Sequence, residues 1–192
     1  MNTFWVYFNS GFYHLINLEA LDHWLFILVM CVIYELKDWK KLIWIISSFT
    51  IAHSISLLLS VYGIFSLPSY WVEFLIAFTI FFTAVENIFI PQLHRYRILF
   101  SGFFGLIHGL GFSAQIKNLF AGTDISLIGI IFSFNIGIEA AQIIILTALF
   151  LFLSGILYFV PINSRKLNIA ISAPIALFAA YLMLQRNFLF TN

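Results

Sequence analysis

The chain has 192 residues, of which 62% are hydrophobic and only 9% are charged, against about 25% charged residues in an ordinary soluble domain. Its mean hydropathy is +1.03, and a soluble domain of this size cannot bury that much apolar surface in one core. Nine Lys and Arg against eight Asp and Glu provide no basic surface for nucleic acid. The single cysteine, Cys31, excludes an internal disulfide and a cysteine-rich zinc site. The composition therefore predicts a polytopic membrane protein.

The predicted fold is an all-α bundle of transmembrane helices in one integral membrane domain over residues 1–192. A bilayer core of about 30 Å needs roughly 20 apolar residues in each crossing helix. About six spans are expected, at residues 21–36, 42–62, 70–90, 98–116, 126–153 and 167–184. The residues before them are rich in aromatic side chains and lack the positive n-region of a signal peptide. They are predicted to form an interfacial or half-inserted helix, with a short seventh span as the alternative.

Basic residues predict the orientation of these spans. Seven of the nine fall in loops on the same side: Lys37, Lys40, Lys41, Arg95, Arg97, Arg165 and Lys166. By the positive-inside rule this side faces the cytoplasm. The protein is therefore expected in the cell (inner) membrane, with its N-terminus and its C-terminus outside.

Ionisable side chains inside the predicted spans are the candidates for function, because burying them in a bilayer is costly. Four histidines and two carboxylates can converge in the outer half of the bundle. These predicted metal-handling residues are His14, Asp22, His23, His53, His108 and Glu139. Imidazole and carboxylate groups bind divalent metals such as nickel, cobalt and zinc. The alternative is that each histidine only forms hydrogen bonds between helices.

Other polar residues are expected along a transport path or around the metal site. They are Ser54, Asn135, Gln142, Thr83, Glu86 and Asn87. Asn135 and Gln142 share one helical face with Glu139, because their spacing is i, i+4, i+7. Near the cytoplasmic end of the third span, Glu86 is either a proton carrier or a carboxylate that snorkels near Arg95 and Arg97. These two interpretations are equally compatible with the sequence.

Glycines surround His108 in the fourth predicted span. They are Gly102, Gly105, Gly109 and Gly111. Gly105 and Gly109 have the spacing by which small residues let two membrane helices approach closely. Close packing is therefore predicted here, with a locally unwound helix along an ion path as the alternative. Both interpretations place His108 in the interior of the protein.

Short motifs follow one another in a characteristic order over about residues 11–142. They are Gly11-Phe12-x-His14, Asp22-His23-x-Leu25-Phe26, Phe49-Thr50-x-Ala52-His53-Ser54, Glu86-Asn87, His108-Gly109-Leu110-Gly111-Phe112 and Phe134-Asn135-x-Gly137-x-Glu139. This series resembles the HupE/UreJ family. The resemblance implies a secondary permease for nickel, and in some members cobalt, associated with hydrogenase and urease systems. It implies the same metal-handling residues, although His14 and Asp22 are separated by more residues here than in the better-known members.

Two functions are compatible with the histidines. The first is a secondary transporter for nickel or cobalt, and the absence of a P-loop motif excludes an autonomous ATP-driven pump. The second is an intramembrane zinc hydrolase in which Asp22 or Glu139 acts as general base. Polar residues toward the inner face favour the transporter over the enzyme, and an accessory subunit is a third option. Expected partners are the lipid bilayer and the nickel, cobalt or zinc ion, with a homo-oligomer as an option.

Overall fold

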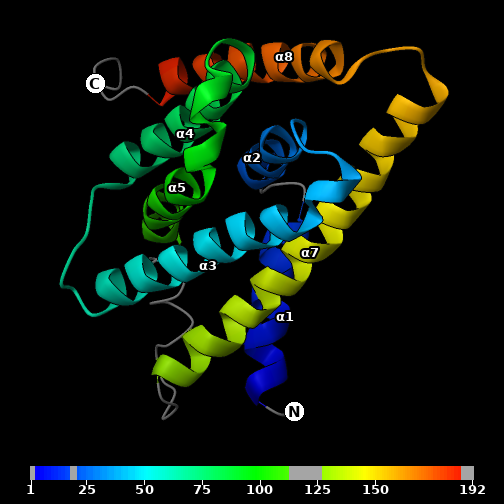
Figure 1. Cartoon of the computed structure of the whole chain (residues 1–192). Coiled ribbons are helices and arrows are strands. Elements are labelled where there is room, and N and C mark those ends of the chain that lie inside the picture. The colour runs from blue at the N-terminus through cyan, green and yellow to red at the C-terminus, as the bar shows by residue number, and fades with distance from the viewer. Residues whose placement is uncertain (1–2, 18–20, 113–126, 187–192) are drawn as a thin grey trace.

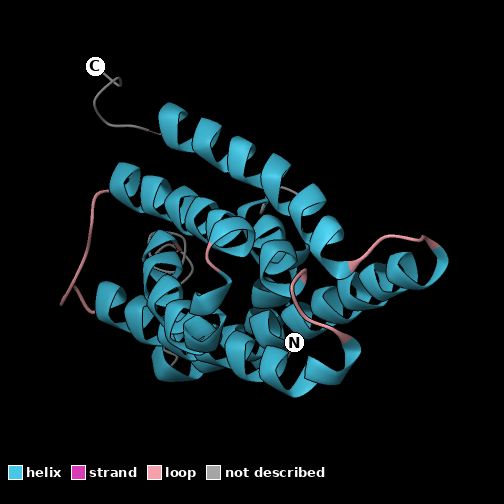
Figure 2. Ribbon diagram, turned by 45° about the horizontal axis from the view of Figure 1, so that its top comes forward, coloured by secondary structure: helices cyan, strands magenta, loops and turns pink. Residues whose placement is uncertain are grey.

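The computed structural model describes residues 3–17, 21–112 and 127–186 of the chain. Within these residues every regular element is a helix, which confirms the predicted all-α class (Figures 1 and 2). The elements are α1 (Thr3–Ile16), α2 (Leu21–Cys31), η1 (Leu36–Asp38), α3 (Trp39–Val61), α4 (Ser69–Phe89), η2 (Pro91–Tyr96), α5 (Arg97–Gly111), α7 (Leu127–Phe159) and α8 (Ser164–Gln185).

Four of these helices are long and apolar enough to cross a membrane, namely α3, α4, α7 and α8. The helices α1 and α2 pass the same test together as a pair bent by 71°, so the described residues contain four or five candidate spans. Helix α5 has 15 residues, and residues 113–116 of the predicted fourth span lie outside the described part of the chain. The chain is thus a multi-helix membrane protein, while the predicted count of about six spans is not confirmed.

The predicted first span at residues 21–36 is not one helix. Helix α2 ends at Cys31 after 11 residues, and at 1.5 Å per residue it covers about 16 Å, roughly half of a bilayer core. The chain then turns into η1, where the Glu35 N–H donates to the Asp38 carboxylate (3.3 Å). Hydropathy alone could not predict this break, because Val32 and Ile33 are as apolar as the helix before them.

Glycines allow two pairs of helices to touch through their backbones. In α1 and α7, a Cβ at Gly11 would overlap the Phe134 carbonyl, and one at Gly137 would overlap the Phe8 carbonyl. Figure 1 shows α1, in blue, lying along the first half of α7. In α3 and α5, a Cβ at Gly109 would overlap the His53 carbonyl oxygen. The predicted close packing around His108 is therefore confirmed, and α5 is helical through Gly111.

Charged residues mark two opposite ends of the bundle, which we name for the predicted orientation. At the outer end, Arg186 after α8 pairs with Asp22 of α2 (2.9 Å) and donates to the Glu73 carbonyl of α4 (3.3 Å). At the inner end, Arg165 of α8 donates to the Asn87 carbonyl of α4 (2.8 Å). Which end faces the cytoplasm stays a prediction.

Candidate metal centre and polar column

Four histidines from four helices lie together: His14 of α1, His23 of α2, His53 of α3 and His108 of α5. We call them the histidine cluster. The ring centre of His23 lies 5.3 Å from that of His14 and 5.4 Å from that of His108. His53 interacts electrostatically with the other three. The structure therefore brings together four of the six residues that the sequence predicts to handle a metal.

Close helix packing and aromatic side chains position this cluster. The contact of Gly109 with the His53 backbone draws α5 onto α3 and so brings His53 and His108 together. Around the imidazoles lie four phenylalanine rings, with centres 4.0–6.1 Å from a histidine ring: Phe26, Phe49, Phe112 and Phe134. Such a wall lowers the local dielectric and strengthens electrostatic interactions. Sequence analysis did not single out these phenylalanines, although they lie inside the motifs.

Three ring nitrogens of the cluster have no hydrogen-bond partner among the described residues. They are the buried Nδ1 atoms of His23, His53 and His108. An unpaired buried polar group costs about 1–3 kcal/mol, so these nitrogens are suited to a ligand. The Nε2 atom of His108 does have a partner, the Thr79 hydroxyl at 3.0 Å. Hydrogen bonds between helices, the alternative function of these histidines, therefore account for Nε2 of His108 but not for the three unpaired Nδ1 atoms.

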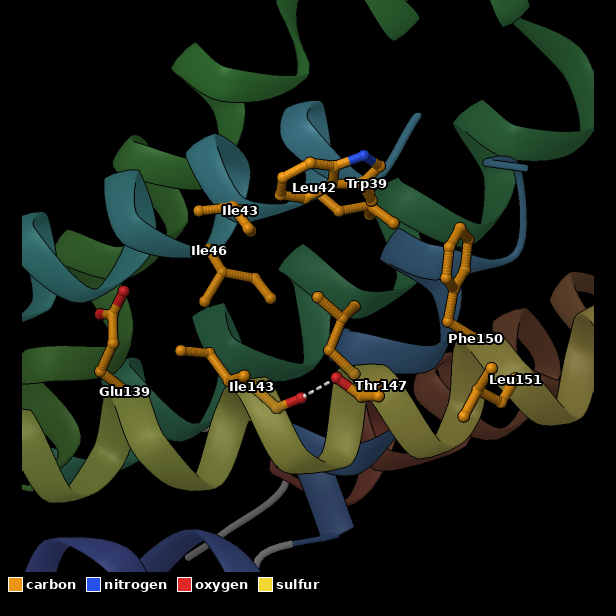
Figure 3. Close-up of a pocket in the computed structure, with 10 residues that line it drawn as sticks. Trp39, Leu42, Ile43, Ile46, Glu139, Ile143, Thr147, Phe150 and Leu151 are labelled. Atoms are coloured by element: carbon orange, nitrogen blue, oxygen red, sulfur yellow. Dashed lines mark hydrogen bonds between the residues drawn. The ribbon is translucent and has the colours of Figure 1, made fainter. Parts of the chain in front are cut away.

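The two predicted carboxylates have other contacts. Asp22 pairs with Arg186 at the outer end, as described above. Glu139 accepts a hydrogen bond from the Ser47 hydroxyl (2.7 Å) and borders an apolar groove of about 330 Å³ between α3 and α7 (Figure 3). In the described part of the chain, no group of three or more His, Cys, Asp and Glu side chains has metal-holding geometry as it stands.

The polar residues predicted on α3 and α7 join these two helices in part. The Asn135 side chain interacts with the His53 imidazole. Gln142 accepts a hydrogen bond from the Thr50 hydroxyl (2.7 Å), one turn further along α7 than Glu139. Ser54 instead donates to the Thr50 carbonyl of its own helix (2.7 Å). Asn135 and Gln142 therefore support α3, which carries His53, whereas Ser54 makes its bond within α3.

A line of polar side chains on α4 connects the histidine cluster with the inner end. Thr79, Thr83 and Glu86 follow at i, i+4 and i+7 and therefore share one helical face. All three are at most 2% exposed. At 1.5 Å per residue they span about 10 Å, and Thr79 contacts His108 at the outer end of this line. We call Thr79, Thr83 and Glu86 the polar column.

Known protein families were compared with the chain that contains this histidine cluster and polar column. The family model described as HupE / UreJ protein matches residues 1–186, which include the whole histidine cluster and the whole polar column. The chain belongs to the HupE/UreJ family. This membership and the apolar helices identify an integral membrane protein and support a metal permease in general. The comparison with curated proteins and the comparison with solved structures found no match.

The inner end of this HupE/UreJ protein contains an ion pair that is buried, whereas the sequence predicts a Glu86 that either carries protons or snorkels toward water near the arginines. Glu86 pairs with Arg97, and both side chains are 2% exposed. The Arg97 guanidinium also donates to the Asn87 side-chain oxygen (2.6 Å) and contacts the Met30 sulfur (3.3 Å). Glu86 therefore does not snorkel to water, because Arg97 is buried with it. Arg97 was assigned to a loop, although a buried carboxylate requires a partner and Arg97 begins α5.

Asn87 links the inner end of the HupE/UreJ bundle together. Its amide donates to the Val29 carbonyl of α2 (2.7 Å) and to the Ser172 hydroxyl of α8 (3.2 Å). Its backbone carbonyl accepts from Asn168 of α8 (2.9 Å). Asn87 thus joins α2, α4 and α8. In addition to its predicted role along the transport path, it therefore has a structural role.

His94 in η2 lies beside the same ion pair. Its Nε2 atom is 3.4 Å from the Glu86 carboxylate. Burial, with further contributions from Arg97 and Arg165, lowers the pKa of His94 to about 4. His94 is therefore neutral at neutral pH. His94 is not among the site residues that the sequence predicts, because its position along the chain gives no signal for its contact with Glu86.

Proposed function

We propose that this HupE/UreJ protein is a secondary transporter for a divalent transition metal, nickel or cobalt. The ion binds at the histidine cluster and then moves inward along the polar column. The observation that supports this proposal most directly is continuity. His108 contacts Thr79, and buried polar groups follow from there through Thr83 to Glu86 at the inner end. A transporter needs such groups beyond its binding site, because the membrane interior offers an ion no other favourable contacts.

The histidine cluster has the chemistry for the first binding step. Two imidazoles on one tetrahedral ion, with metal–nitrogen bonds of about 2.05 Å, have ring centres about 5.2 Å apart. The separations of His23 from His14 and from His108 are 5.3 and 5.4 Å. Rotation about the soft χ2 angles would turn the free nitrogens toward a common ion. Imidazoles would then replace part of the hydration shell of the metal inside the phenylalanine wall.

Glu139 and Gln142 are proposed to support the site from the α3–α7 contact. Ser47 and Thr50 of α3 donate hydrogen bonds to Glu139 and Gln142 at 2.7 Å each, and on α3 Ser47 lies about two turns and Thr50 about one turn before His53. The two bonds hold α3 in register against α7 and so orient His53. Residues that fix the orientation of a metal ligand in this way commonly matter 10–100-fold for affinity or activity.

The alternative, an intramembrane zinc hydrolase, has less support. A hydrolase built on three histidines needs a carboxylate or a similar base beside the metal-bound water. The two candidates for that base, Asp22 and Glu139, are paired with Arg186 and Ser47. A hydrolase also has no use for a line of polar side chains that continues to the inner end of the bundle.

The decisive experiment measures metal uptake by the full chain in proteoliposomes. Nickel, cobalt and zinc are offered to wild type and to His23→Ala, His53→Ala and His108→Ala. Each substitution is expected to abolish high-affinity uptake, and double substitutions should be little worse, because ligands of one ion act as a unit. Thr147→Val is the control, since Thr147 bonds only the Ile143 carbonyl of its own helix among the described residues. Wild-type uptake by any two of the histidine variants would refute a shared site.

A further inference from the structure

The Arg97 guanidinium occupies a position that is built from metal-binding groups. It contacts the Glu86 carboxylate, and its distance to the Asn87 side-chain oxygen is 2.6 Å. Arg97 is only 1% exposed and is among the largest fully buried side chains of the described residues. A buried carboxylate in a membrane protein cannot stay uncompensated, because an unpaired buried charge costs several kcal/mol. In this structure the compensating cation is a side chain of the protein.

Two further ligand atoms face each other beside this guanidinium. Glu86 Oε1 and His94 Nε2 are both buried without a hydrogen-bond partner among the described residues. Their separation is 3.4 Å. Two ligand atoms on one tetrahedral ion are about 3.3–3.4 Å apart when each metal bond is about 2.0–2.1 Å long. Carboxylate, amide and imidazole groups from Glu86, Asn87 and His94 therefore provide a suitable ligand set for a divalent transition metal.

A cavity next to this position can receive the arginine side chain. The cavity has a volume of about 490 Å³, and its lining includes Arg97, His94 and Tyr34. Tyr34 lines this cavity, and an aromatic ring can hold a guanidinium through a cation–π contact. Lys41 and Arg95 also line the cavity. Their positive charges would raise the free energy of the displaced arginine, so that it would return to Glu86 once the ion has left.

We propose that Arg97 is the resident cation of an inner metal station formed by Glu86, Asn87 and His94, and that an arriving divalent ion displaces it into the adjoining cavity. This inference rests on the proposed function, because the ion reaches the station along the polar column. Without metal, Arg97 neutralises Glu86 and closes the inner end of the column. A divalent ion brings twice the charge of the guanidinium and can replace it, whereas a monovalent ion offers no such advantage.

The test is a nickel titration by calorimetry on the purified full chain in detergent. Arg97→Gln removes the competing cation and should raise nickel affinity at the inner station at least tenfold. The added binding should disappear in Arg97→Gln combined with Glu86→Gln or with His94→Ala. Lys40→Gln is the control, since it removes a positive charge from the same end of the bundle at a residue that lies against Trp39 and is not in the lining of this cavity, and it should leave nickel affinity within about twofold of wild type.

A second variant keeps the proposal testable if Arg97→Gln does not fold. Arg97→Lys retains a cation for Glu86 but loses the planar fork that also bonds Asn87. It should raise nickel affinity by a smaller factor, roughly threefold. Wild-type affinity in Arg97→Lys together with an unchanged or unfolded Arg97→Gln would overturn the inference.

Binding at the histidine cluster is measured in the same titrations, which separates the two proposals. Loss of wild-type binding in His53→Ala, with no gain in either Arg97 variant, refutes the inner station and leaves the transporter proposal standing. A gain in the Arg97 variants, with undiminished binding in His53→Ala, supports the inner station and refutes the shared histidine site.

Discussion

At the scale of single residues, the hydroxyl of Thr79 joins the histidine cluster to the polar column. Thr79→Val keeps the shape of the side chain but removes the contact with His108 Nε2. We expect a loss of about 1 kcal/mol in the free energy of unfolding, as for one buried hydrogen bond. Nickel binding at the cluster should persist, while transport in proteoliposomes slows, because the step from His108 to the column is impaired. Equal slowing in Thr147→Val would show that the effect is not specific to the column.

Arg186 holds the Asp22 carboxylate at the outer end. Both side chains of this pair are 21–25% exposed, so the pair contributes little to stability, about 0–1 kcal/mol. Arg186→Gln should therefore leave the melting temperature nearly unchanged. It should raise nickel affinity several-fold, because Asp22 then becomes available next to His23. The comparison is the double variant Arg186→Gln/Asp22→Asn, in which the gain in nickel affinity should be absent. A gain in both the single and the double variant would mean that loss of the positive charge of Arg186 is sufficient, without Asp22 as a ligand.

His94 gives the inner end a dependence on pH. Burial, then Arg97 and Arg165, lower its pKa from 6.5 to about 4, so between these values the unfolded chain binds more protons than the folded chain. The contribution of His94 to stability is therefore complete above pH 6.5 and is lost as the pH falls toward 4. His94→Gln should unfold thermally with a weaker dependence on pH between 6.5 and 4 than wild type. An unchanged slope would mean that the pKa of His94 is the same in the folded and the unfolded chain.

At the scale of helices, Gly109 sets the distance between α3 and α5. A Cβ there would overlap the His53 carbonyl oxygen, which is backbone and cannot move aside alone. Gly109→Ala should therefore destabilise the fold by about 1–3 kcal/mol and abolish nickel binding in the folded fraction, because His53 and His108 move apart. At Gly155 an added Cβ meets nothing within 4 Å. Gly155→Ala should thus bind nickel normally and gain about 0.5–1 kcal/mol in helix stability; equal losses in both variants would contradict this explanation.

Helix geometry also explains how much of the site the sequence could predict. Depth along a span is a one-dimensional quantity, and counting residues sufficed to place His23, His53 and His108 in the same half of the bundle. Which neighbour a helical face meets depends on how helices cross. Asn135 and Glu139 share one face of α7, yet Asn135 meets His53 whereas Glu139 meets Ser47. The sequence predicts the stripe but not the crossing point.

Hydropathy predicts where spans lie along the chain but not which side chains they bury together. Hydropathy located α3, α4, α7 and α8 to within a few residues in most cases, because each is a long apolar run. Helix α7 extends six residues beyond the predicted end at residue 153 and reaches Phe159. The burial of Arg97 could not be predicted from hydropathy, because it depends on the position of Glu86 on a different helix. Local composition identifies spans, whereas partners come from tertiary packing.

At the scale of the whole molecule, the orientation can be tested with single cysteines. Cys31 is fully buried, so the native chain provides a low background for thiol labelling. Because seven basic residues share one side of the predicted topology, Lys40→Cys should resist a membrane-impermeant maleimide applied from outside the cell. Tyr62→Cys, at the other end of α3 and 56% exposed, should react. The opposite pattern would invert the assigned outer and inner ends and, with them, the direction of the proposed transport.

The backbone contact between α1 and α7 has a mechanical consequence. Gly11 and Gly137 leave no space for a side chain between these helices, so His14 and Asn135 travel together whenever either helix shifts. The contact of Gly109 with α3 couples His53 and His108 in the same way. An ion bound by both His14 and His108 would therefore join two rigid helix pairs, α1 with α7 and α3 with α5, in addition to the hydrogen bonds between α3 and α7. Its departure would remove one connection between the pairs and leave the Ser47–Glu139 and Thr50–Gln142 hydrogen bonds in place, so each round of binding and release would stiffen and then loosen the contact between them.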